Sequence, residues 1–181
     1  MYGNVKVGSA VPKLRVADCV YNKEEILKLV EAAAAKQVRV LSFPELSVTG
    51  YTCADLFFQA PLLHAAEQAI QEIAEATEAL NIFLLIGAPI AVDNQMFNCA
   101  VALYKGKLLG IVPKTHIPNY SEFYEERWFA SADDLLTEEI TYAGQNVPIG
   151  ADLIFAAADF PALKIGVEIC EDLWVPIPPS S

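Results

Sequence analysis

The stretch that decides the fold is NKEEILKLVEAAAAKQVRVLSFPE, residues 22–45. It opens with Asn22, a residue type that often caps a helix, and two glutamates follow where a first helical turn would lie. Three apolar residues at helical spacing then form one face: Ile26, Val30 and Ala33. A β-rich run, residues 38–43, comes next, and its pattern predicts a strand buried on both faces. The stretch therefore predicts a helix that leads directly into a buried strand.

The flanking segments continue this alternation of strands and helices. Pro61 suits the first turn of a second helix over residues 61–80, which carries its own apolar stripe. Lys105–Gly106 is typical of a tight hairpin turn, and Ser121 is a candidate cap for a short helix. We expect irregular structure between Ala130 and Gly150. The predicted strands, besides residues 38–43, are residues 4–12, 82–90, 97–104, 107–112, 153–157 and 163–169. This order predicts one α/β domain.

Composition excludes two classes of partner. The chain has 181 residues and a formal net charge of −11, with no basic stripe, so nucleic acid and anionic membrane surfaces would be repelled. Hydrophobic residues make up 54% of the chain and the mean hydropathy is +0.34, yet no apolar run reaches membrane-spanning length. We interpret the excess apolarity as a sign of wide interfaces or of a piece of a larger fold.

The four cysteines, Cys19, Cys53, Cys99 and Cys170, show no C-x-x-C spacing. They are typical of reduced thiols in a cytoplasmic protein rather than of a disulfide framework or a metal site. The N-terminus lacks the pattern of a signal peptide. We therefore expect a cytoplasmic protein without a metal centre.

Three reactive residues follow separate predicted strands. Glu45 follows residues 38–43, Lys114 follows residues 107–112, and Cys170 ends the alternating run LKIGVEIC. Ligand sites in α/β sheets favour such strand ends. The neighbouring acids should raise the pKa of the thiol, so we expect Glu45 to act as a base and Lys114 to supply the offsetting charge. A buried structural cysteine, solvated loop residues and a histidine base, with His116 the better placed of two, remain open alternatives.

Three blocks carry a family resemblance: FPELSVTGY, PKTHIPNYSEFYEERWF and VEICEDLW, in this order. They resemble the signature blocks of the nitrilase, or carbon–nitrogen hydrolase, superfamily. The motifs IPNYSEFYEERWF and GVEICEDLW are most similar to those of the glutaminase domains of glutamine-dependent NAD⁺ synthetases. The resemblance covers nearly all of the chain. The resemblance implies an α-β-β-α sandwich of the α/β class. Because such a sandwich continues beyond this cysteine, we expect residues 1–181 to be its N-terminal portion only.

The resemblance also implies roles for individual residues. Glu45 matches the base of a Glu–Lys–Cys triad, Lys114 the lysine, Cys170 the nucleophile, and Glu122 a second glutamate that supports the triad. Residues that fall where related domains line the glutamine pocket are Tyr51, Tyr120, Phe123, Glu125 and Glu171.

The implied reaction is hydrolysis of the glutamine side-chain amide, which supplies ammonia for ATP-dependent amidation of deamido-NAD⁺. No Gly-rich phosphate loop occurs in the chain, so ATP and Mg²⁺ would belong to a synthetase domain absent from it, and the chain itself would need no cofactor. We expect a homo-oligomer, and little turnover from the 181 residues alone. The alternatives are a stand-alone ω-amidase or nitrilase, and a non-catalytic fragment that serves as an interface.

Overall fold

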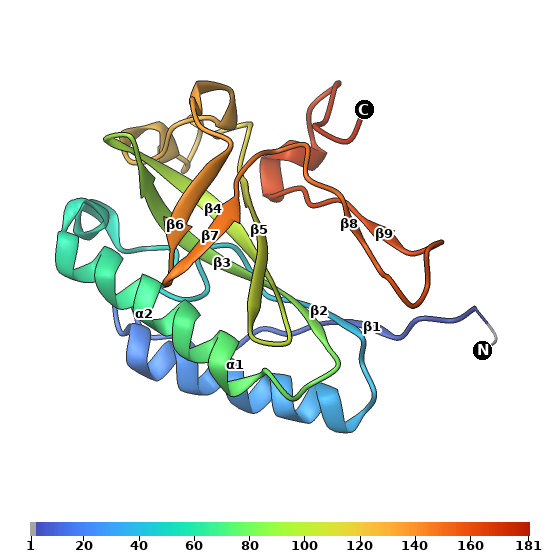
Figure 1. The fold of residues 1–181 in the computed structure, drawn as a ribbon. Coiled ribbons are helices and arrows are strands. Elements are labelled where there is room, and N and C mark those ends of the chain that lie inside the picture. Colours follow the sequence, from blue (N-terminus) through green and yellow to red (C-terminus); the bar gives the residue numbers. More distant parts are fainter. Residues whose placement is uncertain (1–2) are drawn as a thin grey trace.

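The computed structural model describes residues 3–181 and shows an α/β fold, with two helices packed side by side on one face of a mixed sheet (Figure 1). The helices are α1 (Cys19–Ala35) and α2 (Ala60–Ala76), and the short 3₁₀ helices are η1 (Ala54–Phe58), η2 (Glu125–Arg127), η3 (Ala132–Asp134) and η4 (Cys170–Leu173). The strands are β1 (Val7–Ser9), β2 (Val40–Ser42), β3 (Phe83–Val92), β4 (Gln95–Tyr104), β5 (Lys107–Pro113), β6 (Glu139–Tyr142), β7 (Gln145–Pro148), β8 (Phe155–Ala156) and β9 (Lys164–Ile165).

Five strands form the main sheet in the order β1-β2-β3-β4-β5. The first three are parallel to one another, whereas β3, β4 and β5 form an antiparallel meander joined by tight turns. Because two reversals restore the direction, β5 runs the same way as β2. The carboxyl ends of β2 and β5 therefore point to the same edge of the sheet, which brings residues from distant parts of the sequence together.

The first helix begins before its predicted start. Asp18 is the N-cap, and its side chain accepts the backbone N–H of Tyr21. Asn22, the predicted cap, is fully buried and donates instead to the backbone oxygens of Arg15 and Val48, at 2.8 and 2.9 Å. The prediction was wrong because the Asn22 side chain connects two loops to the helix. A capping rule that considers only neighbouring residues cannot detect such long-range contacts. The apolar face predicted for the helix is confirmed, since all three of its residues are buried.

The two faces of the sheet differ in character. Residues at alternate positions of β3 and β4, such as Ile86 and Val101, pack with α1 and α2 in the main hydrophobic core. The residues between them, including Gly87 and Asn98, therefore face the opposite side. The functional residues described below lie on that second face, which the helices do not cover.

The region predicted to be irregular contains a second hairpin, formed by β6 and β7. Its turn, Ala143–Gly144, has positive φ at both residues, 50° and 72°, as in tight hairpin turns. The Ala143 N–H donates to Glu67 of α2 at 2.8 Å, and Val147 is fully buried. The prediction was wrong because Ala143 occupies a turn position where asparagine or aspartate is usual, so the sequence does not indicate a hairpin there.

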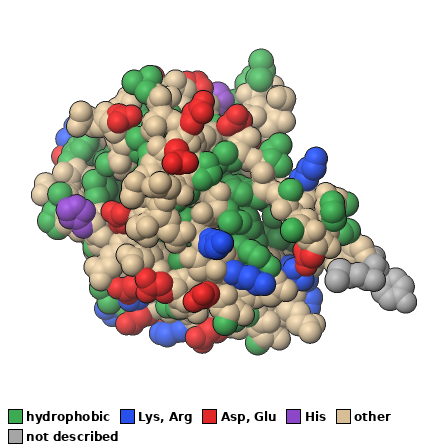
Figure 2. All heavy atoms as spheres, viewed as in Figure 1, with side chains coloured by type: hydrophobic (Ala, Val, Ile, Leu, Met, Phe, Trp, Pro, Cys, Tyr) green, Lys and Arg blue, Asp and Glu red, His purple; other side chains and the backbone are tan. Residues whose placement is uncertain are grey.

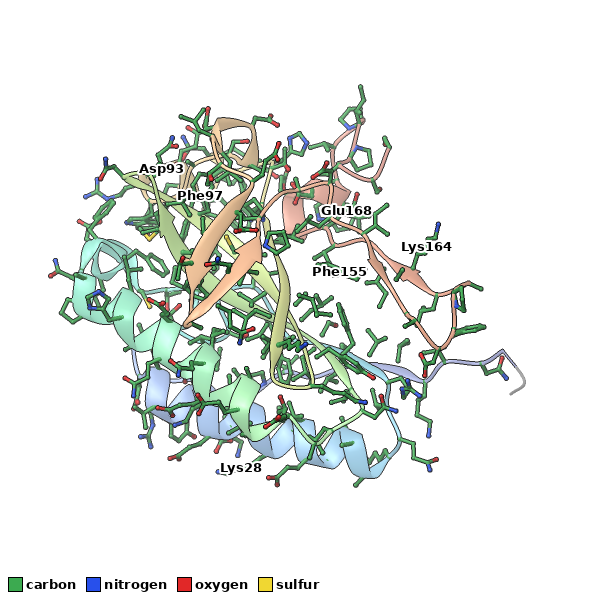
Figure 3. The ribbon with its side chains drawn as sticks, viewed as in Figure 1. Lys28, Asp93, Phe97, Phe155, Lys164 and Glu168 are labelled. Atoms are coloured by element: carbon green, nitrogen blue, oxygen red, sulfur yellow. The ribbon has the colours of Figure 1, made fainter. Side chains whose placement is uncertain are left out.

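Strands β8 and β9 form an arm that lies over the helix-free face, where the space-filling view shows apolar side chains gathered in the hollow between the arm and the body (Figures 1 and 2). Phe155 of β8 lies between the arm and the sheet, whereas Lys164 of β9 points away (Figure 3). The Phe155 ring contacts that of Phe83 at 5.4 Å between centroids. The predicted strand 163–169 is shorter than expected, because β9 ends at Ile165.

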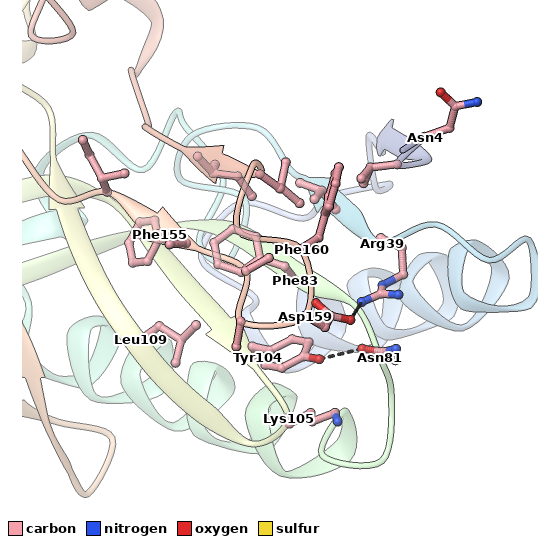
Figure 4. Close-up of a pocket in the computed structure, with 18 of the residues that line it drawn as sticks. Asn4, Arg39, Asn81, Phe83, Tyr104, Lys105, Leu109, Phe155, Asp159 and Phe160 are labelled. Carbon is pink, nitrogen blue, oxygen red and sulfur yellow. Dashed lines mark hydrogen bonds and ion pairs between the residues drawn. The ribbon is translucent and has the colours of Figure 1, made fainter. Parts of the chain in front are cut away.

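A cavity of about 840 Å³ lies beneath this arm (Figure 4). Apolar residues from β3, β5 and the arm line much of it, and two polar contacts lie at one side. Arg39 pairs with Asp159 at 3.1 Å, and the Tyr104 hydroxyl donates to Asn81 at 2.6 Å. No helix within residues 3–181 has the length and apolarity needed to cross a membrane.

Candidate active site

Glu45 reaches the helix-free face because the backbone around it crosses directly over β3. The crossing point is Gly87, where a Cβ atom would lie 2.3 Å from the Leu46 nitrogen and 2.5 Å from the Pro44 oxygen. The Val48 N–H also donates to the Gly87 oxygen at 3.1 Å. Only glycine permits so close an approach of two backbones, so Gly87 determines how near to the sheet Glu45 can lie.

Lys114 directly follows β5, and its side chain is completely buried between two carboxylates. Its Nζ atom lies 3.0 Å from Oε2 of Glu45 and 2.9 and 3.1 Å from the two oxygens of Glu125. Burial alone would lower the pKa of Lys114, but attraction to Glu45 and the hydrogen bond to Glu125 outweigh it, and the pKa is raised. Lys114 is therefore an ammonium held in a site largely shielded from water.

Asn98 of β4 orients the Glu45 carboxylate. Its Nδ2 donates to Oε2 of Glu45 at 2.9 Å, and its backbone oxygen accepts the Lys114 N–H at 2.8 Å. Oε2 thus accepts two donors, while no donor within residues 3–181 bonds Oε1, which remains available to take a proton. Asn98 was not among the predicted site residues, although a lone amide inside the apolar run FNCAVAL is a signal for a buried polar role.

Glu125, and not Glu122, contacts Lys114. Glu122 is exposed to solvent, and its expected role in supporting the triad stays a prediction. Glu125 is 2% exposed and also accepts the Tyr51 hydroxyl at 2.6 Å. Burial and this hydrogen bond raise the pKa of Tyr51, which keeps its proton on the phenol. Glu125 and Tyr51 are thus tied into the charged cluster, and their expected place in the glutamine pocket stays a prediction.

An exposed clasp fastens the segment that carries Glu125. Asp55 of η1 accepts two hydrogen bonds from Arg127, both at 2.7 Å, and one from the indole N–H of Trp128 at 3.0 Å. These hydrogen bonds to Arg127 and Trp128 lower the pKa of Asp55 to about 2. The clasp thus joins η1 to η2, the short helix that begins at Glu125.

Cys170 is the exposed one of the four free cysteines, and it begins η4 in a left-handed conformation with φ of 49°. The expected position at a strand end was wrong, since β9 stops at Ile165. Partial burial raises the pKa of the thiol, Glu45 raises it further, and Lys114 opposes this only in part. The thiol is therefore protonated at neutral pH, and its activation requires a base within reach. The charges of both Glu45 and Lys114 thus act on this thiol, in opposite directions.

Contacts through Tyr120 link the other predicted pocket residues, Phe123 and Glu171. The Tyr120 hydroxyl donates to both oxygens of Glu171, at 2.8 and 2.9 Å, and the Phe123 ring packs edge-on against Tyr120 at 6.1 Å. Tyr120 and Glu171 also line an open groove of about 950 Å³, which continues past His116. The bond between them links the loop after Lys114 to the residue after Cys170.

Asp172, which was not among the predicted site residues, is buried and lies two positions after Cys170 in the sequence. Its Oδ1 accepts the backbone N–H groups of Thr115 and His116, at 3.2 and 2.8 Å, and its Oδ2 accepts that of Ile169 at 3.1 Å. Within residues 3–181, no group of three or more His, Cys, Asp or Glu side chains is arranged to hold a metal ion. The reactive groups described here are a thiol, two carboxylates and an ammonium.

The chain matches a known protein family. The model of the carbon-nitrogen hydrolase family matches residues 7–177. The chain belongs to the carbon-nitrogen hydrolase family. Among curated members, the glutamine-dependent NAD⁺ synthetase of Mycobacterium leprae is 38% identical over 179 residues, which cover 99% of this chain and 26% of that protein. The corresponding synthetase of Aquifex aeolicus is 30% identical over 161 residues. The chain thus spans about a quarter of the length of these relatives.

Solved structures of this hydrolase family show the same fold. A glutamine-dependent NAD⁺ synthetase from Cytophaga hutchinsonii superposes with a TM-score of 0.83 at 30% identity, over 92% of this chain and 28% of that one. An amidase from Nesterenkonia sp. AN1 superposes with a TM-score of 0.71 at 16% identity, over 96% of this chain and 60% of that one. The expected fold class is confirmed: an α/β nitrilase-like fold that corresponds to part of the full-length relatives.

Proposed function

We propose that the protein that carries this chain hydrolyses the side-chain amide of glutamine through Cys170, Glu45 and Lys114. The observation that carries the proposal is the fully buried Lys114 ammonium, held between Glu45 and Glu125, together with the action of these three charges on the pKa of the exposed Cys170 thiol. Such a cluster is costly to bury, and burial of this kind is typical of sites that stabilise developing charge. The glutamine dependence of the relatives named above supports glutamine as the substrate.

In the proposed reaction, Glu45 accepts the thiol proton as the sulfur attacks the amide carbon. A C–S bond forms, and the carbonyl oxygen becomes an oxyanion that Lys114 and the backbone N–H of Glu171 stabilise. Glu45 then returns the proton to the nitrogen, the C–N bond breaks, and ammonia leaves. Water, deprotonated by Glu45, cleaves the glutamyl thioester to glutamate and restores the thiol.

Several groups are assigned supporting parts in this proposal. Glu125, held by Tyr51, keeps Lys114 charged and in place. Tyr120, Phe123 and Glu171 border the approach to Cys170, where a carboxylate such as that of Glu171 would attract the ammonium group of glutamine.

At the level of the whole protein, we propose that residues 1–181 form the N-terminal part of a nitrilase-like glutaminase domain. The ammonia would pass to a synthetase domain outside this chain, which uses ATP and Mg²⁺ to amidate deamido-NAD⁺. The names of the relatives support this assignment. The free cysteines are consistent with a cytoplasmic location, and the apolar hollow under β8 and β9 with association into a homo-oligomer.

Ammonia release tests the proposal directly. The natural protein that carries this chain is incubated with glutamine, and glutamate and ammonia are measured beside the Cys170→Ala variant. We expect release by the wild type and a loss of roughly 10⁶-fold in the variant, as when other nucleophiles are removed. Hydrolysis of short aliphatic amides or nitriles but not of glutamine would favour a stand-alone amidase or nitrilase. Full activity of Cys170→Ala would refute the mechanism.

A further inference from the structure

Lys114 and Cys170 belong to segments more than fifty residues apart in the sequence, and one buried side chain bonds to both segments. Asp172 is 2% exposed, and its two oxygens accept three backbone N–H groups. Oδ1 binds Thr115 and His116, which immediately follow Lys114. Oδ2 binds Ile169, which immediately precedes Cys170. Each oxygen of this carboxylate therefore serves a different catalytic segment.

Helix capping does not account for this arrangement. The bond to Ile169 is a local capping contact within η4, but Thr115 and His116 lie outside any helix and are separated from Asp172 by 57 and 56 positions. A carboxylate that serves only as a cap would leave its second oxygen to water. Here both oxygens are used, in a place where an unsatisfied carboxylate would be costly.

The backbone conformation of Cys170 is a second sign that Asp172 does more than cap a helix. Its φ of 49° is unfavourable for a residue with a Cβ atom, and such conformations persist only where the surroundings over-determine them. Asp172 bonds to the backbone on the N-terminal side of Cys170 and lies two residues after it, so it closes a tight loop around the strained residue.

We propose that Asp172 is a positioning residue that holds Cys170 in its left-handed conformation and sets its distance from Lys114 and Glu45. The inference rests on the proposed function for its catalytic meaning, although the geometry it describes does not depend on the substrate. The carboxylate is required because it presents two acceptors. An asparagine would present one acceptor and one NH₂ group, and the NH₂ group would face a backbone N–H on one side or the other.

The test is the coupling between Glu45 and Cys170. Cys170 is alkylated with iodoacetamide across a pH range in the natural protein carrying this chain, with mass spectrometry to follow this thiol separately from the three buried ones. When Asp172 is intact, Glu45→Gln should lower the pH midpoint of alkylation, because Glu45 raises the pKa of the Cys170 thiol. In an Asp172→Asn background, we expect this shift to shrink by about half or more, since the two groups are no longer held together.

Catalysis provides a second readout. We expect Asp172→Asn to lower kcat for glutamine by about 10²-fold, the effect of a misplacement of about 1 Å, with little change in KM. Asp134→Asn, the same change at an exposed carboxylate, serves as the matched control and should alter neither readout. Ile70→Val, on the buried face of α2, controls for the effect of lowered stability alone.

An unchanged Glu45→Gln shift together with a wild-type kcat in Asp172→Asn would overturn the inference. If that variant does not fold, Asp172→Glu keeps both oxygens but displaces them by one methylene, and the same two measurements apply with the same expectations. A shrunken shift in a protein that releases no ammonia from glutamine would support the positioning role while refuting the proposed function.

Discussion

The two halves of the candidate site are built in opposite ways. The charged half, Glu45, Lys114 and Glu125, lies on the sheet, is held by neighbours from several elements and is almost closed to water. The thiol half, Cys170, is exposed and belongs to a segment that reaches the sheet through few contacts, chiefly those of Asp172 and Glu171. The difference teaches that the buried charges are fixed by the core of the fold, whereas the proposed nucleophile is attached to it by a few contacts.

Replacement of Lys114 breaks the charged half and should have the largest effect. Lys114→Met leaves two carboxylates facing each other in a buried site, so we expect a loss of about 3–5 kcal/mol in the free energy of unfolding. Urea unfolding measures this. Cys170→Ala is the matched comparison in the thiol half, and it should change stability by no more than about 0.5 kcal/mol because the side chain is exposed. Equal losses in the two variants would contradict the contrast.

Gly87→Ala should disturb the charged half by displacing the backbone around Glu45, without changing any charged side chain. The added Cβ would lie within 2.6 Å of the Glu45 carbonyl carbon and closer still to its neighbours, so the loop over β3 must move away. We expect a cost of about 1–3 kcal/mol from overpacking and a fall of roughly 10²-fold in glutamine turnover from the displaced base. Gly144→Ala, in the open turn between β6 and β7, is the control that separates backbone strain from this collision. A Gly87→Ala protein with normal turnover would show that Glu45 does not depend on the crossing.

Titration of Cys170 sharpens the comparison, because it reports how strongly the charged half acts on the thiol. The pKa of Cys170 lies above its ordinary value of 9.0, through burial first and then through Glu45 and, more weakly, Glu171. A carboxylate repels the thiolate, so its removal must lower the alkylation midpoint. We therefore expect Glu45→Gln to lower this midpoint more than Glu171→Gln does, although Glu171 is the sequence neighbour. A larger shift from Glu171→Gln than from Glu45→Gln would mean that Cys170 lies away from the cluster of Glu45, Lys114 and Glu125.

The smallest effect is expected from the exposed clasp. Asp55→Asn weakens the bonds to Arg127 and Trp128, yet glutamine turnover should change by less than about fivefold, because exposed ion pairs contribute little. The folded-state pKa of Asp55 is depressed to about 2, so the clasp stabilises the fold above the ordinary carboxyl pKa of 3.8 and fails as the pH falls toward 2. Acid unfolding monitored by circular dichroism should begin at a slightly higher pH in the variant. A large loss of turnover at neutral pH would mean that the clasp holds Glu125 in place.

The sequence predicted the main layers well because they follow from periodicity. The buried face of α1, the meander of β3, β4 and β5, and the approach of Glu45 and Lys114 to one sheet edge all derive from alternation and strand direction. The family resemblance is confirmed by the family match, and the fold class by the solved relatives.

Side-chain direction in the loops did not follow from the sequence. Glu122 and Glu125 are both acids in one aromatic block, and only the local backbone, with a positive φ of 52° at Ser121, decides which of them turns inward. The expected helix cap at Ser121 failed for the same reason, since η2 begins at Glu125. Asp172 resembled its neighbour Glu171 in sequence, but one is buried and the other borders the groove. Irregular segments have no period from which orientation can be predicted.

The edges of the main sheet have a consequence for behaviour at high concentration. An open strand edge is a template for intermolecular pairing and aggregation. Here β1 ends one side of the sheet and is only three residues long, whereas β5 on the other side is partly covered by a bridge between Ile111 and Ile149. A short edge and a covered edge offer a neighbouring chain little backbone to pair with, so the fold is protected against growth of the sheet from molecule to molecule.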